Sequence, residues 1–225
     1  MDCPVIESVF SVGYTGKKVA TTENSIPLKA GEISILVGNN GAGKTTFLKT
    51  VCGSLPPIVG VAPTGQKVYL PEELGFPPLL TSHEILSNLF VSASLVIEAA
   101  ILFGIPSNTP YQNLSKGNKQ KLRVLIAEQF ATLTRASILC LDEPLSGLDT
   151  LARQLLVDVW NQKRHLPSVF SNPHRIVSMH TGEAPTNVQT IVVDGGKIRR
   201  LPPISNCDTW MAFASEHGIK LSASK

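Results

Sequence analysis

The order of apolar and polar positions along this chain predicts short strands interleaved with helices. Residues 33–37 (ISILV) and 138–141 (ILCL) are continuous apolar runs, which are typical of strands buried in a parallel sheet. Residues 175–180 and 190–194 predict two more short strands. Together these segments predict a mainly parallel sheet.

Helical patterns lie between these strands. Residues 46–52 predict a first helix, and Thr81-Ser82-His83-Glu84 has the capping-box pattern that opens a helical region extending to about Gly104. Residues 150–164 predict an amphipathic helix. Four apolar residues of another helix recur at helical spacing, and they are Leu122, Leu125, Ile126 and Phe130.

The first part of the chain has an antiparallel character. Residues 4–12 alternate well enough for a strand, residues 14–18 predict a polar turn, and residues 25–28 predict a further short strand. After the first helix, residues 60–62 and 67–70 are arranged like a hairpin, although the second of them could instead join the central sheet. An antiparallel piece therefore precedes the central elements.

Composition narrows the class of protein. The 225 residues are 43% hydrophobic and 16% charged, which describes a globular chain rather than a disordered one. A formal charge of +3 is too small to indicate a nucleic-acid partner, and the short basic clusters at 116–121 and 197–200 are expected to be solvated faces. The apolar run 89–103 is shorter than a bilayer span of about 20 residues.

Cysteine usage indicates the compartment. The four cysteines are far apart and show no C-x-x-C pair, so we expect reduced thiols in a cytosolic protein and neither a disulfide nor a zinc framework. The start of the chain, MDCPVIES, lacks the pattern of a signal peptide. We expect a polypeptide that does not cross a membrane by itself.

The strongest chemical signal is the segment GNNGAGKTTF, which fits G-x-x-x-x-G-K-[ST] between the strand 33–37 and the helix 46–52. Glycines allow backbone N–H groups to surround a polyphosphate, and the helix start adds its positive dipole end. Lys44 would contact the β- and γ-phosphates, and the Thr45 hydroxyl would bind Mg²⁺. The predicted nucleotide-binding residues are Gly38, Asn39, Asn40, Gly41, Ala42, Gly43, Lys44, Thr45 and Thr46.

A second signal follows the strand 138–141, which ends in two adjacent acids. Asp142 is placed to hold Mg²⁺, and Glu143 is placed to polarise the attacking water. Many strands end in acids, so this pattern is weak by itself. Joined to the glycine loop, it indicates an ATPase site.

The order of these motifs resembles the ATP-binding subunit of ATP-binding-cassette (ABC) transporters. The resemblance covers about residues 5–200 and includes the segments LSKGN at 114–118, LCLDEP at 139–144 and SGLD at 146–149. It implies an α/β fold: a P-loop NTPase core with a mainly parallel sheet, the antiparallel piece and a small helical lobe. We expect one domain, with the core at about 1–70 and 115–205, the lobe at about 71–114 and a tail at about 206–225.

The resemblance also implies roles for residues outside the glycine loop. In this family two subunits face head to tail, so Ser115 and Gly117 would contact the γ-phosphate that the other subunit holds. Asp149 would join the two sites across the interface, and His180 would sense the γ-phosphate. Tyr14 lies where the family often stacks an aromatic ring on adenine.

Three departures from the family pattern affect these expectations. Glu72, in the segment YLPEE, stands where the family has a Mg²⁺-binding glutamine, although some exporter-type relatives resemble this segment. Lys116 and Asn118 replace the usual glycine and glutamine of the signature segment. The insertion before Leu114 is shorter than in most relatives, which predicts a reduced lobe.

The function implied by the resemblance is hydrolysis of ATP, with Mg²⁺ as cofactor, to energise a polytopic membrane subunit, with a lean toward export. A second ABC ATPase subunit, identical or different, would complete the dimer at the cytoplasmic face of the membrane. The alternatives are a soluble ABC ATPase without transport and a regulatory ATP-binding module with little turnover. The apolar run 76–80 is expected to be a contact patch for the membrane subunit rather than core.

Overall fold

The computed structural model describes residues 4–7, 9–91, 93–161, 171–179 and 188–201, together with Ala212 and Ser215. The strands are β1 (Val5–Ile6), β2 (Ser11–Tyr14), β3 (Lys17–Thr22), β4 (Ile26–Pro27), β5 (Ile33–Val37), β6 (Lys67–Leu70), β7 (Ile138–Leu141), β8 (His174–Ser178), β9 (Gln189–Asp194) and β10 (Lys197–Leu201). The helices are α1 (Lys44–Val51), α2 (Ser82–Leu89), α3 (Ser94–Leu102), α4 (Lys116–Leu133) and α5 (Thr150–Trp160), with a 3₁₀ turn, η1, at Tyr111–Asn113.

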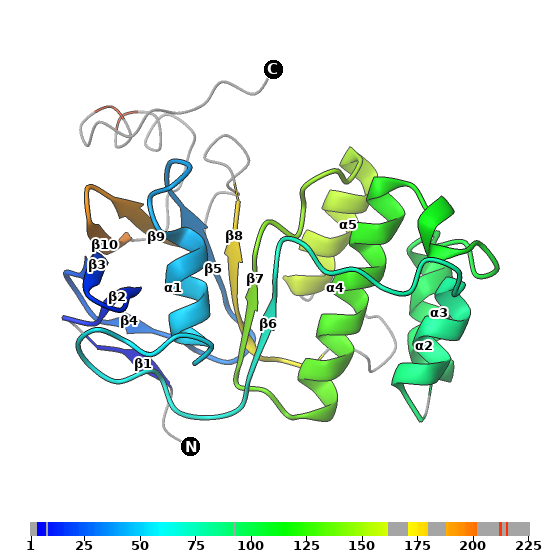
Figure 1. The fold of residues 1–225 in the computed structure, drawn as a ribbon, viewed down its shortest axis with the longest axis horizontal. Helices are drawn as coiled ribbons and strands as arrows, with labels where there is room; N and C mark the ends of the chain where they lie inside the picture. Colours follow the sequence, from blue (N-terminus) through cyan, green and yellow to red (C-terminus); the bar gives the residue numbers. More distant parts are fainter. Residues whose placement is uncertain are drawn as a thin grey trace.

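Eight of these strands form one sheet in the order β2-β3-β10-β9-β5-β8-β7-β6, while β1 pairs with β4 alone. The run from β9 through β5, β8 and β7 to β6 is parallel at every step. β2 and β3 are antiparallel, as are β9 and β10. The expected mainly parallel sheet with an antiparallel N-terminal piece is therefore confirmed (Figure 1).

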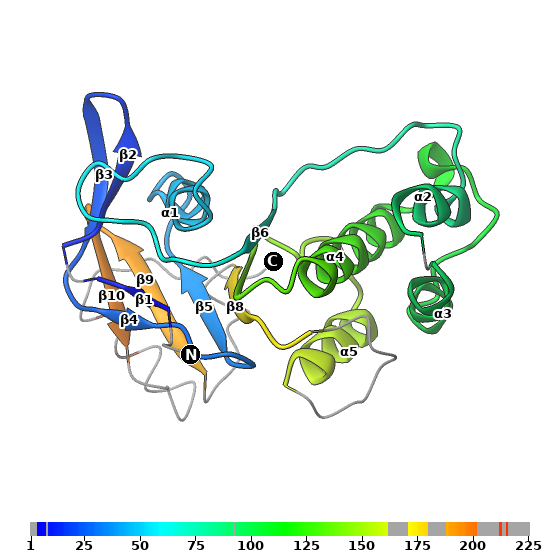
Figure 2. The same ribbon diagram turned by 90° about the horizontal axis from the view of Figure 1, so that it is seen from below.

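The central strand β5 shows how the two faces of the sheet are filled. Its residues Ile33, Ile35 and Val37 belong to one buried cluster, which also holds apolar residues of α2 to α5. Leu36 points to the other face, into a cluster with Phe47 of α1. Because successive side chains of a strand alternate, one apolar strand supplies both cores. Figure 2 shows α1 and α5 on opposite faces of the sheet.

The helical region expected from Thr81 to about Gly104 is confirmed and consists of two helices, α2 and α3. Thr81 forms the predicted capping box with Glu84 at the start of α2. α2 ends at Leu89, and the backbone of the next residue, Phe90, is extended (φ −130°, ψ 124°). The buried ring of Phe90 lies 5.2 Å from the ring of Phe130 in α4, so the link between the two helices packs against α4.

Two segments differ from their expected form. Residues 67–70 form β6, parallel to β7 in the central sheet, so the hairpin alternative is wrong. Tyr14 and Lys17 belong to strands, and the turn between them is shorter than predicted. The basic cluster 197–200 lies in β10, where Lys197 and Arg200 are exposed as expected and Lys197 and Arg199 pair with Glu23 at 2.8 and 3.3 Å.

Strand direction determines where chemistry can occur. β5, β6, β7 and β8 are parallel, so their carboxyl ends meet at one edge of the sheet, which is the upper edge in Figure 1. Ligands of open α/β sheets bind at this edge. Within the part of the chain that the structure describes, no helix is both long and apolar enough to span a membrane.

Candidate active site

The glycine loop joins the carboxyl end of β5 to the first turn of α1, as its sequence predicts. Gly43 caps α1 in the left-handed region (φ 111°), and a Cβ there would lie 2.6 Å from Val19 Cγ1 on β3. A Cβ on Gly38 would collide with the carbonyl oxygen of Val193 on β9. Both glycines are therefore required by close packing against neighbouring strands, which fixes the loop at the sheet edge.

Lys44 is the cation of this loop. Its side chain is nearly buried, and Nζ donates to the carbonyl oxygens of Gly38 and Asn39 at 2.8 and 3.4 Å. These two carbonyls hold the ammonium group above the start of α1. A phosphate that entered the loop would meet this cation and the N–H groups of the helix start together.

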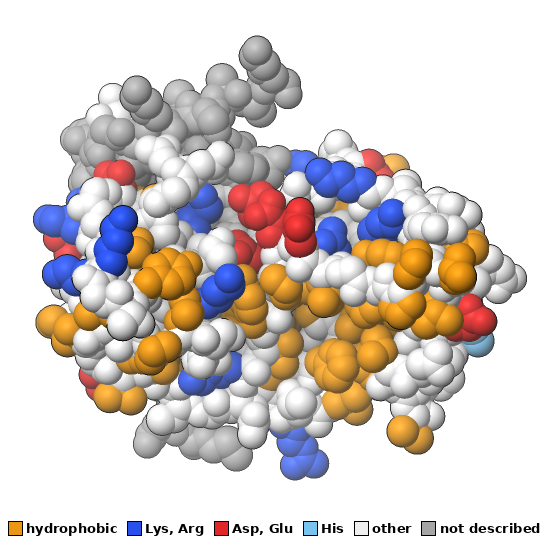
Figure 3. Space-filling view, viewed as in Figure 1, with side chains coloured by type: hydrophobic (Ala, Val, Ile, Leu, Met, Phe, Trp, Pro, Cys, Tyr) orange, Lys and Arg blue, Asp and Glu red, His pale blue; other side chains and the backbone are white. Residues whose placement is uncertain are grey.

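A pocket of about 510 Å³ opens over the loop. Its walls combine loop residues with acids from the ends of β6 and β7, and the lining residues are Asn40, Gly41, Gly43, Lys44, Thr45, Thr46, Glu72 and Glu143. Figure 3 shows acidic side chains gathered in a hollow between the two halves of the molecule, with basic side chains around it. Sequence reasoning had joined the loop, Glu72 and Glu143, and the fold brings them to one cavity.

Asp142 lies behind this pocket with only 2% of its surface exposed. Its Oδ1 accepts from Ser178 Oγ at 2.7 Å, and its Oδ2 accepts from Tyr69 Oη at 3.1 Å. Burial and the negative charge of Asp142 raise the pKa of Tyr69 far above its usual range, so this phenol stays protonated and can donate. The buried carboxylate is thus held by two hydroxyl groups from the neighbouring strands.

Glu143 follows in an unusual backbone conformation with φ of 48°. Its N–H donates to Ser178 Oγ at 2.8 Å, and its carbonyl oxygen accepts from Gln120 Nε2 at 3.3 Å. A non-glycine residue in the left-handed region is strained, and such strain persists only where neighbouring groups hold it. Gln120 on α4 and Ser178 on β8, together with the Ser146 N–H that also donates to the Glu143 carbonyl at 3.1 Å, therefore hold the Glu143 backbone in this conformation.

Sequence reasoning missed Tyr69, Gln120 and Ser178. Ser178 carried one usable signal, since it is a polar residue near the carboxyl end of a strand that is otherwise apolar at its centre. Tyr69 precedes the segment that bears Glu72, and Gln120 lies in the first turns of the signature helix. Their contacts with Asp142 and Glu143 arise only from strand and helix neighbours in space.

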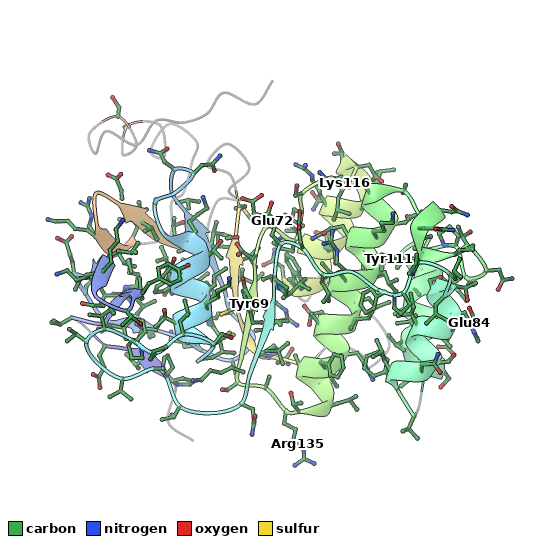
Figure 4. All side chains as sticks on the ribbon, in the orientation of Figure 1. Tyr69, Glu72, Glu84, Tyr111, Lys116 and Arg135 are labelled. Carbon is green, nitrogen blue, oxygen red and sulfur yellow. The ribbon has the colours of Figure 1, made fainter. Side chains whose placement is uncertain are left out.

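Glu72 lies on the segment that connects β6 to the helical lobe. Its carboxylate lines the pocket, and its carbonyl oxygen accepts from Arg123 Nη1 of α4 at 2.8 Å. Figure 4 shows Glu72 beyond Tyr69, at the upper end of β6, with Lys116 at the upper end of α4. α4 therefore holds the backbone at the position where the family has glutamine.

Tyr14 ends β2 beside the loop with half of its surface exposed. The Thr46 hydroxyl lies 3.5 Å from Tyr14 Oη, at the limit of a hydrogen bond. The ring is thus close to the phosphate loop and open to solvent on one side. Stacking on adenine stays a prediction.

Ser115, Gly117 and Asp149 lie apart from the pocket lining. Ser115 is the exposed N-cap of α4, where Oγ accepts from Asn118 N–H, and Asp149 caps α5 by accepting from Ala152 N–H at 2.8 Å. This last bond is the main reason why the pKa of Asp149 lies below its usual range. A Cβ on Gly117 would lie 3.1 Å from the Gly147 carbonyl oxygen, so the two segments are in contact. His180 lies outside the described residues.

The oxygen donors of the site suit Mg²⁺. Among the described residues no cluster of three or more His, Cys, Asp and Glu side chains could hold a metal alone. Mg²⁺ is ordinarily bound by one or two carboxylates together with substrate phosphates, so a dedicated protein cage is not needed. Thr45 and Glu72 line the pocket, and Asp142 immediately precedes the lining residue Glu143 in the chain, so a hydroxyl and two carboxylates are available to the ion.

The apolar run 76–80 divides into two parts. Leu79 is 74% exposed, and Pro77 and Pro78 are exposed as well. Phe76 and Leu80 pack partly against the core, and the Phe76 ring meets Tyr111 edge to face at 5.5 Å. The expectation of a contact patch rather than core was therefore wrong for Phe76 and Leu80, which help to anchor the loop that exposes Leu79.

Comparison with known proteins shows which family the chain resembles. A family model described as "ABC transporter" matches residues 22–146. An uncharacterised ABC transporter ATP-binding protein of Methanocaldococcus jannaschii is 34% identical over 178 residues, which cover 72% of this chain and 65% of that protein. A zinc import ATP-binding protein of Ruegeria pomeroyi is 35% identical over 158 residues, which cover 66% of this chain and 60% of that protein.

The fold also matches solved structures. The ATP binding subunit of an ABC transporter superposes with a TM-score of 0.68 at 22% identity, covering 95% of this chain and all of that chain. At this identity the likeness concerns the fold alone. The chain spans less than two thirds of the length of both curated relatives described above.

Proposed function

Because this chain belongs to the ABC transporter family, we propose that it binds MgATP, hydrolyses it and energises a separate membrane-spanning subunit. The observation that carries this proposal is the pocket in which Lys44 and Thr45 of the glycine loop face Glu72 and Glu143. A phosphate-binding loop, oxygen donors and an acid that can orient water are the parts that phosphoryl transfer to water needs. The lobe at about 71–114 would carry the membrane contacts and the remaining core the chemistry.

Binding would use the loop and its lysine. The ammonium group of Lys44 would exchange the Gly38 carbonyl for the β- and γ-phosphates, since a doubly charged phosphate is the stronger acceptor. Backbone N–H groups from Asn39 to Thr46 would bind the remaining phosphate oxygens. The exposed ring of Tyr14 would stack on adenine.

Hydrolysis would use the two acids at the end of β7. Thr45, Asp142 and Glu72 would hold Mg²⁺, which neutralises charge on the phosphates when it is bound. Glu143 would accept a hydrogen bond from the attacking water and orient it, from a backbone fixed by Ser178 and Gln120. Arg123 would keep Glu72 beside the pocket through its backbone.

We propose that a second ABC ATPase subunit, identical or different, completes the site. Ser115 is an exposed helix cap, and Gly117 lies partly exposed in the first turn of the same helix, so both would be accessible to a γ-phosphate on the other subunit. Asp149 would lie at this interface, and His180 would contact the γ-phosphate. No part of this arrangement requires nucleic acid.

The membrane subunit would dock at the loop that carries Leu79. A leucine with 74% of its surface exposed directly after two exposed prolines, on a loop anchored by Phe76, is suited to a protein contact. This surface lies on the same connecting segment as Glu72, which would pass a change in nucleotide state to it. The chain would then lie at the cytoplasmic face of the membrane. We propose export because YLPEE resembles exporter-type relatives; the import role named for the zinc relatives does not support that direction.

The glycine-loop proposal is tested by Lys44→Ala. We expect MgATP affinity, measured by calorimetric titration, to fall by about 100-fold, since a charge-assisted contact is worth roughly 1.5–3 kcal/mol. Lys49→Ala, on the same helix but away from the pocket lining, is the control and should leave affinity unchanged. Equal affinities in all three proteins would contradict the assignment.

The docking proposal is tested by Leu79→Ser. We expect this variant to keep its melting temperature, because the Leu79 side chain is mostly exposed and contributes little to the core. We also expect it to lose co-purification with the membrane subunit. Val61→Ser, at another exposed apolar position, should co-purify normally. Normal association of the Leu79 variant would place the docking site elsewhere. Uptake or release of cargo by vesicles holding the complex would decide the direction.

A further inference from the structure

A single hydroxyl group on β8 contacts both acids of the site. Ser178 is fully buried, and its Oγ donates to Asp142 Oδ1 at 2.7 Å while accepting the N–H of Glu143 at 2.8 Å. A hydroxyl has one hydrogen to donate and lone pairs to accept, so both bonds can exist together. Ser178 thereby links the side chain of one acid to the backbone of the next.

The two oxygens of Asp142 are held by different residues. Tyr69 on β6 donates to Oδ2 at 3.1 Å, and Ser178 on β8 donates to Oδ1. Because β6 and β8 flank β7 in the sheet, the carboxylate is fixed from both sides. Each oxygen can accept further contacts, so the clamp orients Asp142 without closing it to a metal.

Glu143 depends on Ser178 but not on Tyr69. Its backbone has φ of 48°, and its peptide is held by Ser178 at the N–H and by Gln120 at the carbonyl. Loss of the Ser178 bond would free a strained peptide to relax, and the carboxylate would move with it. Among the described residues Tyr69 Oη bonds to the Asp142 carboxylate and not to that peptide, so its loss should leave Glu143 in place.

We propose that Ser178 is a positioning residue for ATP hydrolysis, whose hydroxyl orients Asp142 toward Mg²⁺ and fixes Glu143 in line with the attacking water. This inference rests on the proposed function. Tyr69 helps to orient Asp142 but does not hold Glu143. The two hydroxyls that bind the same carboxylate therefore differ in what their removal does to turnover.

The test compares Ser178→Ala with Tyr69→Phe. For Ser178→Ala we expect kcat to fall about 30-fold and the half-saturating Mg²⁺ concentration to rise several-fold, with the KM for ATP nearly unchanged. For Tyr69→Phe we expect the same rise for Mg²⁺ but a kcat within about twofold of the parent at saturating metal. Binding of Mn²⁺ in the presence of ADP, followed by electron paramagnetic resonance, measures the metal effect without turnover.

Two controls separate position from stability. Ser34→Ala removes another fully buried hydroxyl, which contacts His174 and Gln189 instead of the acids, so it should lower the melting temperature and leave kcat and Mn²⁺ affinity unchanged. Ser178→Thr and Ser178→Val have nearly the same shape and differ in the hydroxyl. Any crowding affects both, and only the threonine variant should regain activity.

The outcomes are distinct. If the parent chain hydrolyses ATP and Ser178→Ala turns over within twofold of it, the inference is wrong. Equal rates for the threonine and valine variants would also overturn it. If the parent shows no hydrolysis with its membrane subunit, the proposed function fails instead, and unchanged Mn²⁺ affinity in Ser178→Ala would then refute the metal half of the inference separately.

Discussion

The two ends of β8 both carry buried polar side chains, but one end contacts the acids beside the pocket and the other forms an ion pair with α4. At the carboxyl end Ser178 binds Asp142 and the Glu143 peptide beside the pocket. At the amino end Arg175 forms a bidentate ion pair with Glu128 of α4, with Nε and Nη2 at 2.9 and 2.7 Å from the carboxylate. One strand therefore carries two polar networks.

The amino-end network is closed. Glu128 also accepts from Trp160 Nε1 of α5 at 2.7 Å, and its side chain has no exposed surface. Beside it, His174 Nδ1 donates to the Lys29 carbonyl oxygen at 2.9 Å and Nε2 lies 2.8 Å from the Ser34 hydroxyl. These side chains join α4, α5 and β8 to the rest of the fold, and no pocket-lining residue is among them.

The contrast between these two networks indicates which buried polar groups belong to a functional site. Both networks satisfy buried charge, as any fold requires. Only the carboxyl-end network borders a cavity and leaves carboxylate oxygens with room for further partners. Changes at that end should alter turnover with little effect on stability, and changes at the amino end should do the reverse.

The largest effect is expected at the carboxyl end, for Glu143→Gln. The amide keeps the shape but is a poor acceptor for the water proton, so kcat should fall by about 10²–10⁴ while MgATP still binds. Trapped ATP should then hold two subunits together, seen as a mass doubling in light scattering. The melting temperature should stay close to that of the parent.

Glu98→Gln, an exposed acid of α3, is the matched control and should hydrolyse ATP at the parent rate. Hydrolysis by Glu143→Gln at the parent rate would remove Glu143 from the mechanism. A large loss of stability in that variant would contradict the expectation that changes at the carboxyl end of β8 affect turnover rather than stability.

The carboxyl-end network also shows what sequence can and cannot predict. The glycine loop, Asp142 and Glu143 were predictable because each is a local pattern whose chemistry depends on a strand and the residues that follow it. Ser178 and Tyr69 reach Asp142 only because β8 and β6 flank β7, and sequence does not reveal strand order. Phe76 was misassigned for a similar reason, since Tyr111 packs on it from a distant turn.

The boundaries of helices and strands were hard to predict for the same reason, since they depend on contacts between segments that are distant in the sequence. The capping box at Thr81 was predictable from four adjacent residues, whereas the end of α2 depends on Phe90 packing against Phe130 of α4. The ion pair of Arg175 with Glu128 joins residues 47 positions apart, and neither forms part of a local motif. The roles of Ser115, Gly117 and Asp149 stay predictions because they concern a second subunit, and that of His180 stays one because this residue lies outside the described residues.

At the amino end, Glu128→Leu should be strongly destabilising. It leaves the Arg175 guanidinium buried without its carboxylate and removes the acceptor of Trp160, so we expect a loss of about 3–5 kcal/mol in the free energy of unfolding by urea. The rate per folded molecule should be unchanged. A second change, Arg175→Met, should recover part of the loss because the uncompensated charge is gone.

The exposed pair of Lys29 and Glu32, at 3.6 Å, provides the control. Glu32→Gln should cost less than about 1 kcal/mol, since exposed ion pairs contribute little. If Glu128→Leu were as mild as this control, the amino-end network would not be the structural element that we infer.

The smallest expected effect is the pH dependence that His174 imposes. Burial is the main cause that lowers its pKa from 6.5 to about 4, while the Lys29 carbonyl opposes this shift. The unfolded chain therefore binds a proton between pH 6.5 and 4 that the folded chain does not, so stability falls as pH falls through this window. From pH 7.5 to 5 the loss in free energy of unfolding due to this group should be about 2 kcal/mol.

His174→Gln should remove that part of the pH dependence of stability in urea unfolding series, whereas His83→Gln, at an exposed position, should keep it. Parallel pH profiles for the parent and His174→Gln would show that the histidine is not held neutral by the amino-end network. Both histidine substitutions should leave turnover per folded molecule unchanged, because neither residue lines the pocket.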